Sequence, residues 1–138
     1  MQVSFQALAI AAIALSASAG PVGAVSPSGD PVLFWNELML GAGYNPGQTR
    51  PAAMLGIALH DAVNATLGQP NNGYLGPVPT PGRDSRAAAA VAARDILVNA
   101  YPARTAEFDA ALAGQLALVP DGPAKTAGMS TGAIIAAA

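Results

Sequence analysis

The sequence predicts an all-α fold, a helical bundle segment of about five helices. Apolar residues recur at helical spacing between breaks rich in Gly and Pro, and no stretch of useful length alternates as a half-buried strand would. Composition agrees, because 33 of the 138 residues are alanine. Alanine favours helix most strongly and buries little area, so we expect closely packed helices rather than a thick core.

The first two helices are expected in residues 30–67. Asp30 can cap the first, and Pro31 suits its first position, where the missing N–H would have no partner. Gly41, Gly43 and Pro46 end it, and its apolar face consists of Trp35, Leu38, Met39 and Ala42. Thr49 caps the second, which Gly68 and Pro70 stop. Its expected buried side consists of Met54, Leu55, Ala58, Leu59, Ala62 and Val63.

Three more helices are expected after residues 68–82, where four prolines and four glycines predict an irregular loop. The third begins at Asp84 or Ser85 and runs to Tyr101. Thr105 caps the fourth, which Pro120 closes, and its apolar face consists of Phe108, Leu112, Leu116 and Val119. The fifth begins at Asp121 and reaches Ala138 with no stop signal. We interpret this ending as truncation; a natural terminus that frays is the alternative.

Composition and charge limit the classes of function that this chain can have. Charged residues make up 10 % of the chain, against about 25 % in ordinary soluble domains. Such a chain is expected to bury much of its surface against a partner, which the rest of a longer protein would supply. The net charge of −2 and the scattered basic residues argue against nucleic-acid binding. The absence of cysteine excludes disulfides, thiolate metal sites and a Cys nucleophile.

The first 29 residues predict export, to the periplasm or the medium. Ala7 to Leu15 form a short apolar run, and Ala17-Ser18-Ala19 has the small-x-small pattern of a signal peptidase site. We therefore predict a signal peptide over residues 1–19, cleaved after Ala19, and a flexible linker over residues 20–29. A membrane anchor is disfavoured because a span needs about 20 apolar residues.

One cluster of polar residues has side chains of the kinds that could catalyse a reaction or bind a metal: His60, Asp61 and Asn64. At helical spacing Asn64 neighbours both other residues, so an acid/base pair or part of a metal site is one interpretation. However, adjacent side chains diverge by about 100° around a helix, and the chain has no second histidine. We therefore interpret the cluster as a structural polar knot that links its helix to a neighbour through hydrogen bonds with backbone ends.

Four runs of the chain together resemble a known family. Residues 30–37 read Asp-Pro-Val-Leu-Phe-Trp-Asn-Glu, and residues 50–64 read Arg-Pro-Ala-Ala-Met-Leu-Gly-Ile-Ala-Leu-His-Asp-Ala-Val-Asn. Residues 108–112 read Phe-Asp-Ala-Ala-Leu, and residues 119–128 read Val-Pro-Asp-Gly-Pro-Ala-Lys-Thr-Ala-Gly. In this order they resemble the N-terminal helical half of vanadium-dependent haloperoxidase-like proteins, which belong to the PAP2 phosphatase superfamily. The resemblance covers residues 30–138 and implies an incomplete half of a larger helical domain.

The family's site motifs have no counterpart here. The first is a Lys, six residues and then Arg-Pro, but seven residues before Arg50 stands Gly43. The second is Pro-Ser-Gly-His, whereas Pro27-Ser28-Gly29 is followed by Asp30. The third is an Arg followed by a His, and His60 does not fit it. We therefore assign no catalytic, cofactor-binding or metal residue in this chain, and whether it belongs to an enzyme stays open.

Two functions are consistent with these patterns. The resemblance implies an N-terminal scaffold whose partner is the missing C-terminal half of its own chain. That half would bind vanadate, where bound peroxide oxidises a halide, or phosphate, where a His nucleophile hydrolyses a phosphomonoester. The alternative is a free-standing secreted helical module that binds a partner or serves structurally. No membrane span is expected, and a homo-oligomer is left open.

Overall fold

The computed structural model describes residues 29–41, 46–76, 78 and 80–138. Within them the chain forms five α-helices and no strand, which confirms the all-α prediction. The helices are α1 (Pro31–Leu40), α2 (Thr49–Thr66), α3 (Ser85–Ala100), α4 (Thr105–Ala117) and α5 (Pro123–Ala137). The predicted signal peptide, the linker up to residue 28 and Ala42 lie outside the described residues. None of the described helices is long and apolar enough to cross a membrane.

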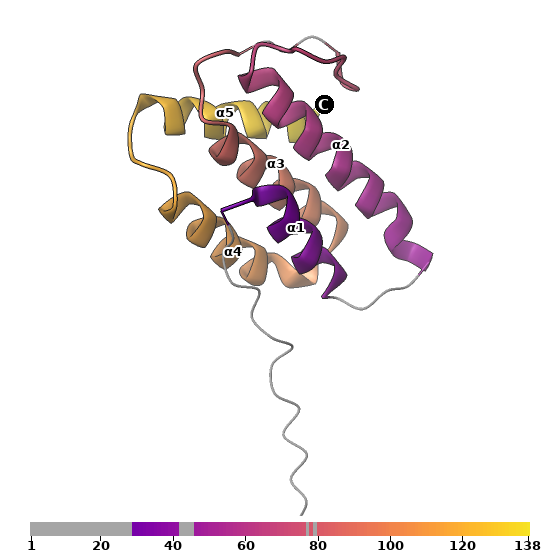
Figure 1. The fold of residues 1–138 in the computed structure, drawn as a ribbon. Helices are drawn as coiled ribbons and strands as arrows, with labels where there is room; N and C mark the ends of the chain where they lie inside the picture. Colours follow the sequence, from indigo (N-terminus) through magenta and orange to yellow (C-terminus); the bar gives the residue numbers. More distant parts are fainter. Residues whose placement is uncertain (1–28, 42–45, 77, 79) are drawn as a thin grey trace, which may run out of the picture.

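Helix α3 is the centre of the bundle, and α1, α2, α4 and α5 all contact it (Figure 1). Residues 87–93, six alanines and one valine, are buried without exception. An alanine side chain ends at Cβ, so neighbouring helices can approach the α3 backbone from several sides. The expected close packing of alanine-rich helices is therefore confirmed.

The closest helix contact is between α3 and α5. A Cβ added at Gly128 would collide with the carbonyl oxygen of Asp84, and one added at Gly132 would collide with that of Ala88. The two glycines lie four residues apart and so occupy one face of α5. Their missing side chains allow α5 to lie directly on the α3 backbone.

Larger side chains fill the space between α1, α2, α3 and α4. The ring of Phe34 meets that of Trp35 edge to face at 5.4 Å between centroids. The guanidinium of Arg104 lies 4.9 Å from the Phe108 ring centroid, and its Nη2 donates to the carbonyl oxygen of Leu38 at 3.2 Å. The fully buried large apolar side chains are Trp35, Leu55, Leu59, Leu97 and Phe108.

Two of the predicted helix caps are confirmed and two are wrong. The Asp30 carboxylate accepts from the N–H groups of Val32 and Leu33, and that of Asp84 accepts from the N–H of Ala87. Thr49 and Thr105 instead lie within the first turns of α2 and α4, because 3₁₀ turns at Pro46–Gln48 and Pro102–Arg104 lead into these helices. The Thr105 hydroxyl donates to the carbonyl of Pro102 rather than accepting a capping bond.

The start of α5 and two buried faces also differ from the prediction. Helix α5 begins at Pro123, and Asp121 stays outside it, with its carboxylate 2.8 Å from the ammonium of Lys125. On α4 the buried residues are Phe108 and Gln115, while Leu112 and Leu116 are only half-buried. On α2 the predicted Met54 and Val63 are half-buried, and the polar Asp61 and Asn64 are buried instead. These polar side chains can be buried on α2 because they have hydrogen-bond partners in the residues that follow the helix.

Candidate functional site

The sequence-predicted polar cluster lies at the C-terminal end of α2, where the following segment folds back over the helix. The carboxylate of Asp61, only 3 % exposed, accepts from the backbone N–H of Tyr74 at 3.0 Å and of Leu75 at 2.7 Å. The Nδ1 atom of His60 lies 2.8 Å from the same carboxylate. Asp61 is therefore the anchor of the segment that follows α2.

Asn64 fastens the same segment one turn further along. Its amide nitrogen donates to the carbonyl of Asn71 at 2.8 Å, and its amide oxygen accepts from the Asn71 N–H at 3.1 Å. Beyond the helix end, the side chain of Gln69 donates to the carbonyl of Gly76 at 3.1 Å. The predicted hydrogen bonds between the cluster and backbone groups are thus present, although their partner is the adjoining loop rather than a neighbouring helix.

The contact between His60 and Asp61 is one that helical geometry did not predict. Adjacent side chains leave a helix about 100° apart, yet these two bend towards each other and meet at 2.8 Å. The ring of Tyr74 then covers the imidazole edge to face, with 5.5 Å between centroids. The expectation that the pair diverges was wrong because the loop that returns to Asp61 also holds the imidazole in place.

The Asp61 carboxyl stays ionised in this setting. Burial alone would raise its pKa, but the hydrogen bond with His60 and those from the N–H groups of Leu75 and Tyr74 together lower the pKa below its ordinary value. An ionised carboxylate only accepts hydrogen bonds, so Nδ1 of His60 carries the proton that it shares with Asp61. In the neutral ring, Nε2 is then left with a lone pair.

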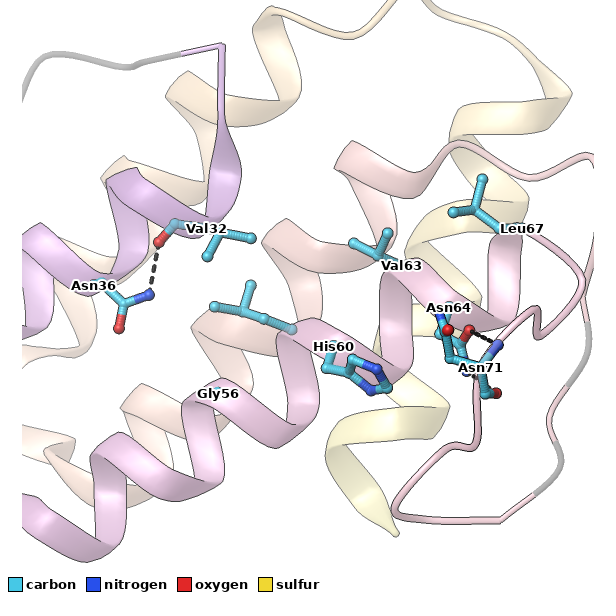
Figure 2. Close-up of a pocket in the computed structure, with 9 residues that line it drawn as sticks. Val32, Asn36, Gly56, His60, Val63, Asn64, Leu67 and Asn71 are labelled. Carbon is cyan, nitrogen blue, oxygen red and sulfur yellow. Dashed lines mark hydrogen bonds between the residues drawn. The ribbon is translucent and has the colours of Figure 1, made fainter.

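A groove of about 330 Å³ runs between α1 and α2 beside this cluster (Figure 2). Its walls combine branched apolar side chains with polar ones, and the lining residues include no Asp, Glu, Lys or Arg. Gly56 forms an open part of it, since a Cβ added there would meet nothing within 4 Å. The lining residues are Val32, Asn36, Gly56, Leu59, His60, Val63, Asn64, Leu67 and Asn71.

A second cleft, of about 200 Å³, lies where α2, α3 and the last turn of α5 meet. Every residue that lines it is apolar: Met54, Ile57, Ala58, Leu75, Ile96, Ile135, Ala136 and Ala138. The side chains of this cleft have no catalytic group, but another apolar segment could pack against them.

Arg50 and His60 do not lie together as they would in a vanadate or phosphate site. Such a site needs several cationic donors around a bound oxyanion together with a histidine. Arg50 and His60 are ten residues apart on α2, which is about 15 Å along the helix axis. Nowhere in the described part of the chain do three His, Asp or Glu side chains gather as they would around a metal ion.

The chain matches no protein-family model, no curated protein and no solved structure. Its resemblance to the helical half of haloperoxidase-like proteins therefore rests on the four runs quoted above and stays a prediction. The groove between α1 and α2 was not foreseen. Its one sequence signal was Gly56, a glycine inside a helical pattern, which often has a packing or functional reason.

Proposed function

We propose that this chain is the N-terminal helical scaffold of an exported, vanadium-dependent haloperoxidase-like protein of the PAP2 phosphatase superfamily. Its role is to pack against and position a half that carries the oxyanion site, and it performs no chemistry by itself. The family part of this proposal rests on the runs at residues 30–37, 50–64, 108–112 and 119–128. Export rests on the signal-peptide pattern of residues 1–19.

The structural observation that carries the scaffold role is the wholly apolar cleft between α2, α3 and α5. A surface of this kind on a chain with 10 % charged residues is suited to burial against another apolar segment. Ala138 lines the cleft, so a segment joined to it lies within reach. Ile134, on the last turns of α5, is 51 % exposed and is a further apolar side chain at the surface.

The cluster around Asp61 supports a role in structure rather than in chemistry. Both carboxylate oxygens are engaged by donors of the chain itself, and the two ends of the Asn64 amide are engaged by Asn71. These groups are therefore committed to holding the loop after α2, which places Leu75 against the apolar cleft.

The test compares two substitutions on α2 in two proteins. Ile57→Asp places a charge in the cleft, and Ala53→Asp places the same charge at an exposed position of the same helix. Each variant is made in the 138-residue chain and in the product of the complete reading frame, and thermal unfolding is measured. On the scaffold account, Ile57→Asp costs about 2 kcal/mol more in the longer product, because the charge is buried only there. Equal costs in both proteins contradict the account, and Ala53→Asp should cost the same in both.

One observation favours a second function, that of a free-standing helical binding or structural module. The five helices already enclose a core of their own around α3, with Trp35 and Phe108 fully buried. In that case the apolar cleft receives a segment of a different protein. A reading frame that stops after codon 138 would select this function.

A further inference from the structure

The groove between α1 and α2 takes no part in the proposed scaffold role, and it has the character of a ligand site. Its volume of about 330 Å³ lies at the lower end of the range for small-molecule sites, about 300–1,000 Å³. Val32 lies on α1, Leu59 and Val63 lie on α2, and Leu67 is the residue that follows the end of α2. Val32, Val63 and Leu67 are labelled in Figure 2. These four side chains form an apolar wall on either side of the open position at Gly56.

Two hydrogen-bond acceptors among the lining residues are available to a ligand. The Nδ1–H of His60 is taken by Asp61, which leaves the Nε2 lone pair without a partner among the described residues. The amide nitrogen of Asn36 donates to the carbonyl of Val32 at 2.8 Å, which leaves its amide oxygen to accept. The side-chain amide of Asn64 is already joined to the backbone carbonyl and N–H of Asn71.

The imidazole is held in this orientation from two sides. Asp61, itself anchored by two backbone N–H groups, fixes Nδ1, and the Tyr74 ring packs edge to face against the imidazole. A held acceptor loses less conformational freedom when a donor binds to it than a mobile side chain would. His60 is therefore a preorganised hydrogen-bond acceptor at the edge of an apolar groove.

We propose that this groove binds a small neutral molecule with an apolar body and one hydroxyl group, a phenol or an alcohol. The hydroxyl donates to Nε2 of His60, and the apolar body lies over Gly56 against Leu59 and Val63. No Lys or Arg is among the described residues that line the groove, so a neutral ligand fits it best. The inference does not rest on the proposed scaffold function.

The experiment uses a matched pair of ligands on the 138-residue chain. The probe is 4-propylphenol, and the control is 4-propylanisole, in which a methyl group replaces the hydroxyl proton. Calorimetry of both ligands, at the same pH, measures the two affinities. Loss of one hydrogen bond corresponds to about a fivefold to tenfold weaker affinity, so the phenol should bind more tightly by that factor.

Two α2 variants locate the site. Gly56→Leu fills the groove without a steric clash, because a Cβ there meets nothing within 4 Å. Ala53→Leu places the same side chain at an exposed position of α2 that does not line the groove. Binding of the phenol should be lost in the first variant and kept in the second, with far-UV circular dichroism as the check that both are folded.

A third variant tests the hydrogen bond. His60→Phe keeps a ring against Tyr74 but has no acceptor, so the phenol and the anisole should bind it equally. Ligand-to-protein Overhauser contacts in the unmodified chain should fall on the methyl groups of Leu59 and Val63, and this measurement does not depend on any variant folding. Equal affinity of the two ligands for the unmodified chain, no binding at all, binding that survives Gly56→Leu, or tighter binding of 4-propylbenzylamine would each overturn the proposal.

Discussion

A single methyl group at position 132 tests how α5 is seated on α3. Gly→Ala inside a helix ordinarily stabilises by about 0.5–1 kcal/mol, because alanine loses less conformational freedom on folding. At Gly132 the added Cβ would collide with the carbonyl oxygen of Ala88 and approach Ala92 N and Val91 Cβ to 3.0 Å. Two of these three atoms belong to the backbone, so α5 must shift away from α3 at this contact.

The magnitude follows from the two opposing effects. Overpacking in a close contact costs about 1–3 kcal/mol, and the better helix propensity of alanine returns at most about 1 kcal/mol. We therefore expect Gly132→Ala to lower the free energy of unfolding by about 1–2 kcal/mol. For a chain of this size, that change lowers Tm by roughly 4–8 °C.

Gly56→Ala is the matched control. It is the same substitution inside α2, at a position where the new Cβ meets nothing within 4 Å, and it should raise Tm by about 2–4 °C. Thermal unfolding followed at 222 nm measures both variants. The reasoning is refuted when Gly132→Ala stabilises the chain as much as Gly56→Ala does, since α5 then does not rest on the α3 backbone.

The remaining predictions concern polar groups. Asp61→Ala removes the acceptor of the Tyr74 and Leu75 N–H groups, so it should lower the free energy of unfolding by about 2 kcal/mol. Amide exchange should become faster at these two residues, while α4 keeps its protection. Unchanged exchange at Tyr74 and Leu75 would contradict the anchor role of Asp61. The folded pKa of Asp61 lies below its ordinary value of 3.8, so its contribution to stability is complete above that value and is lost as the pH falls through the lower folded pKa. The Asp61→Asn variant should not show this loss of stability in acid. If the stability of the variant and of the unmodified chain falls in parallel with pH, the prediction is contradicted. Asp84→Ala removes the cap of α3 and should cost about 1 kcal/mol in urea unfolding, whereas a neutral effect would mean that the cap is not formed in solution.

The helices themselves could be predicted because local signals agree with the tertiary structure. Asp30 and Asp84 are extended residues whose side chains accept from the first turn, as cap patterns predict. Thr49 and Thr105 look similar in the sequence, but the preceding 3₁₀ turns place them inside their helices. Whether a residue before a helix forms such a turn depends on its contacts, which a cap pattern does not contain.

The candidate sites were less predictable, because they depend on which distant groups meet. The sequence placed Asp61 and Asn64 on one helix, but it did not reveal that the loop 13 and 14 residues beyond Asp61 returns to it. This return explains why the carboxylate is buried and why His60 turns towards it against the helical divergence. The groove depends on the separation of α1 and α2, and no periodic pattern in the sequence predicts it.

The nucleotide sequence downstream of codon 138 tests the scaffold role most directly. The account predicts that the frame stays open and encodes a Lys, six residues and Arg-Pro, followed later by Pro-Ser-Gly-His, which together form the oxyanion site of the resembled family. A stop codon immediately after Ala138 would contradict it, and the apolar cleft between α2, α3 and α5 would then belong to a free-standing module with a separate partner.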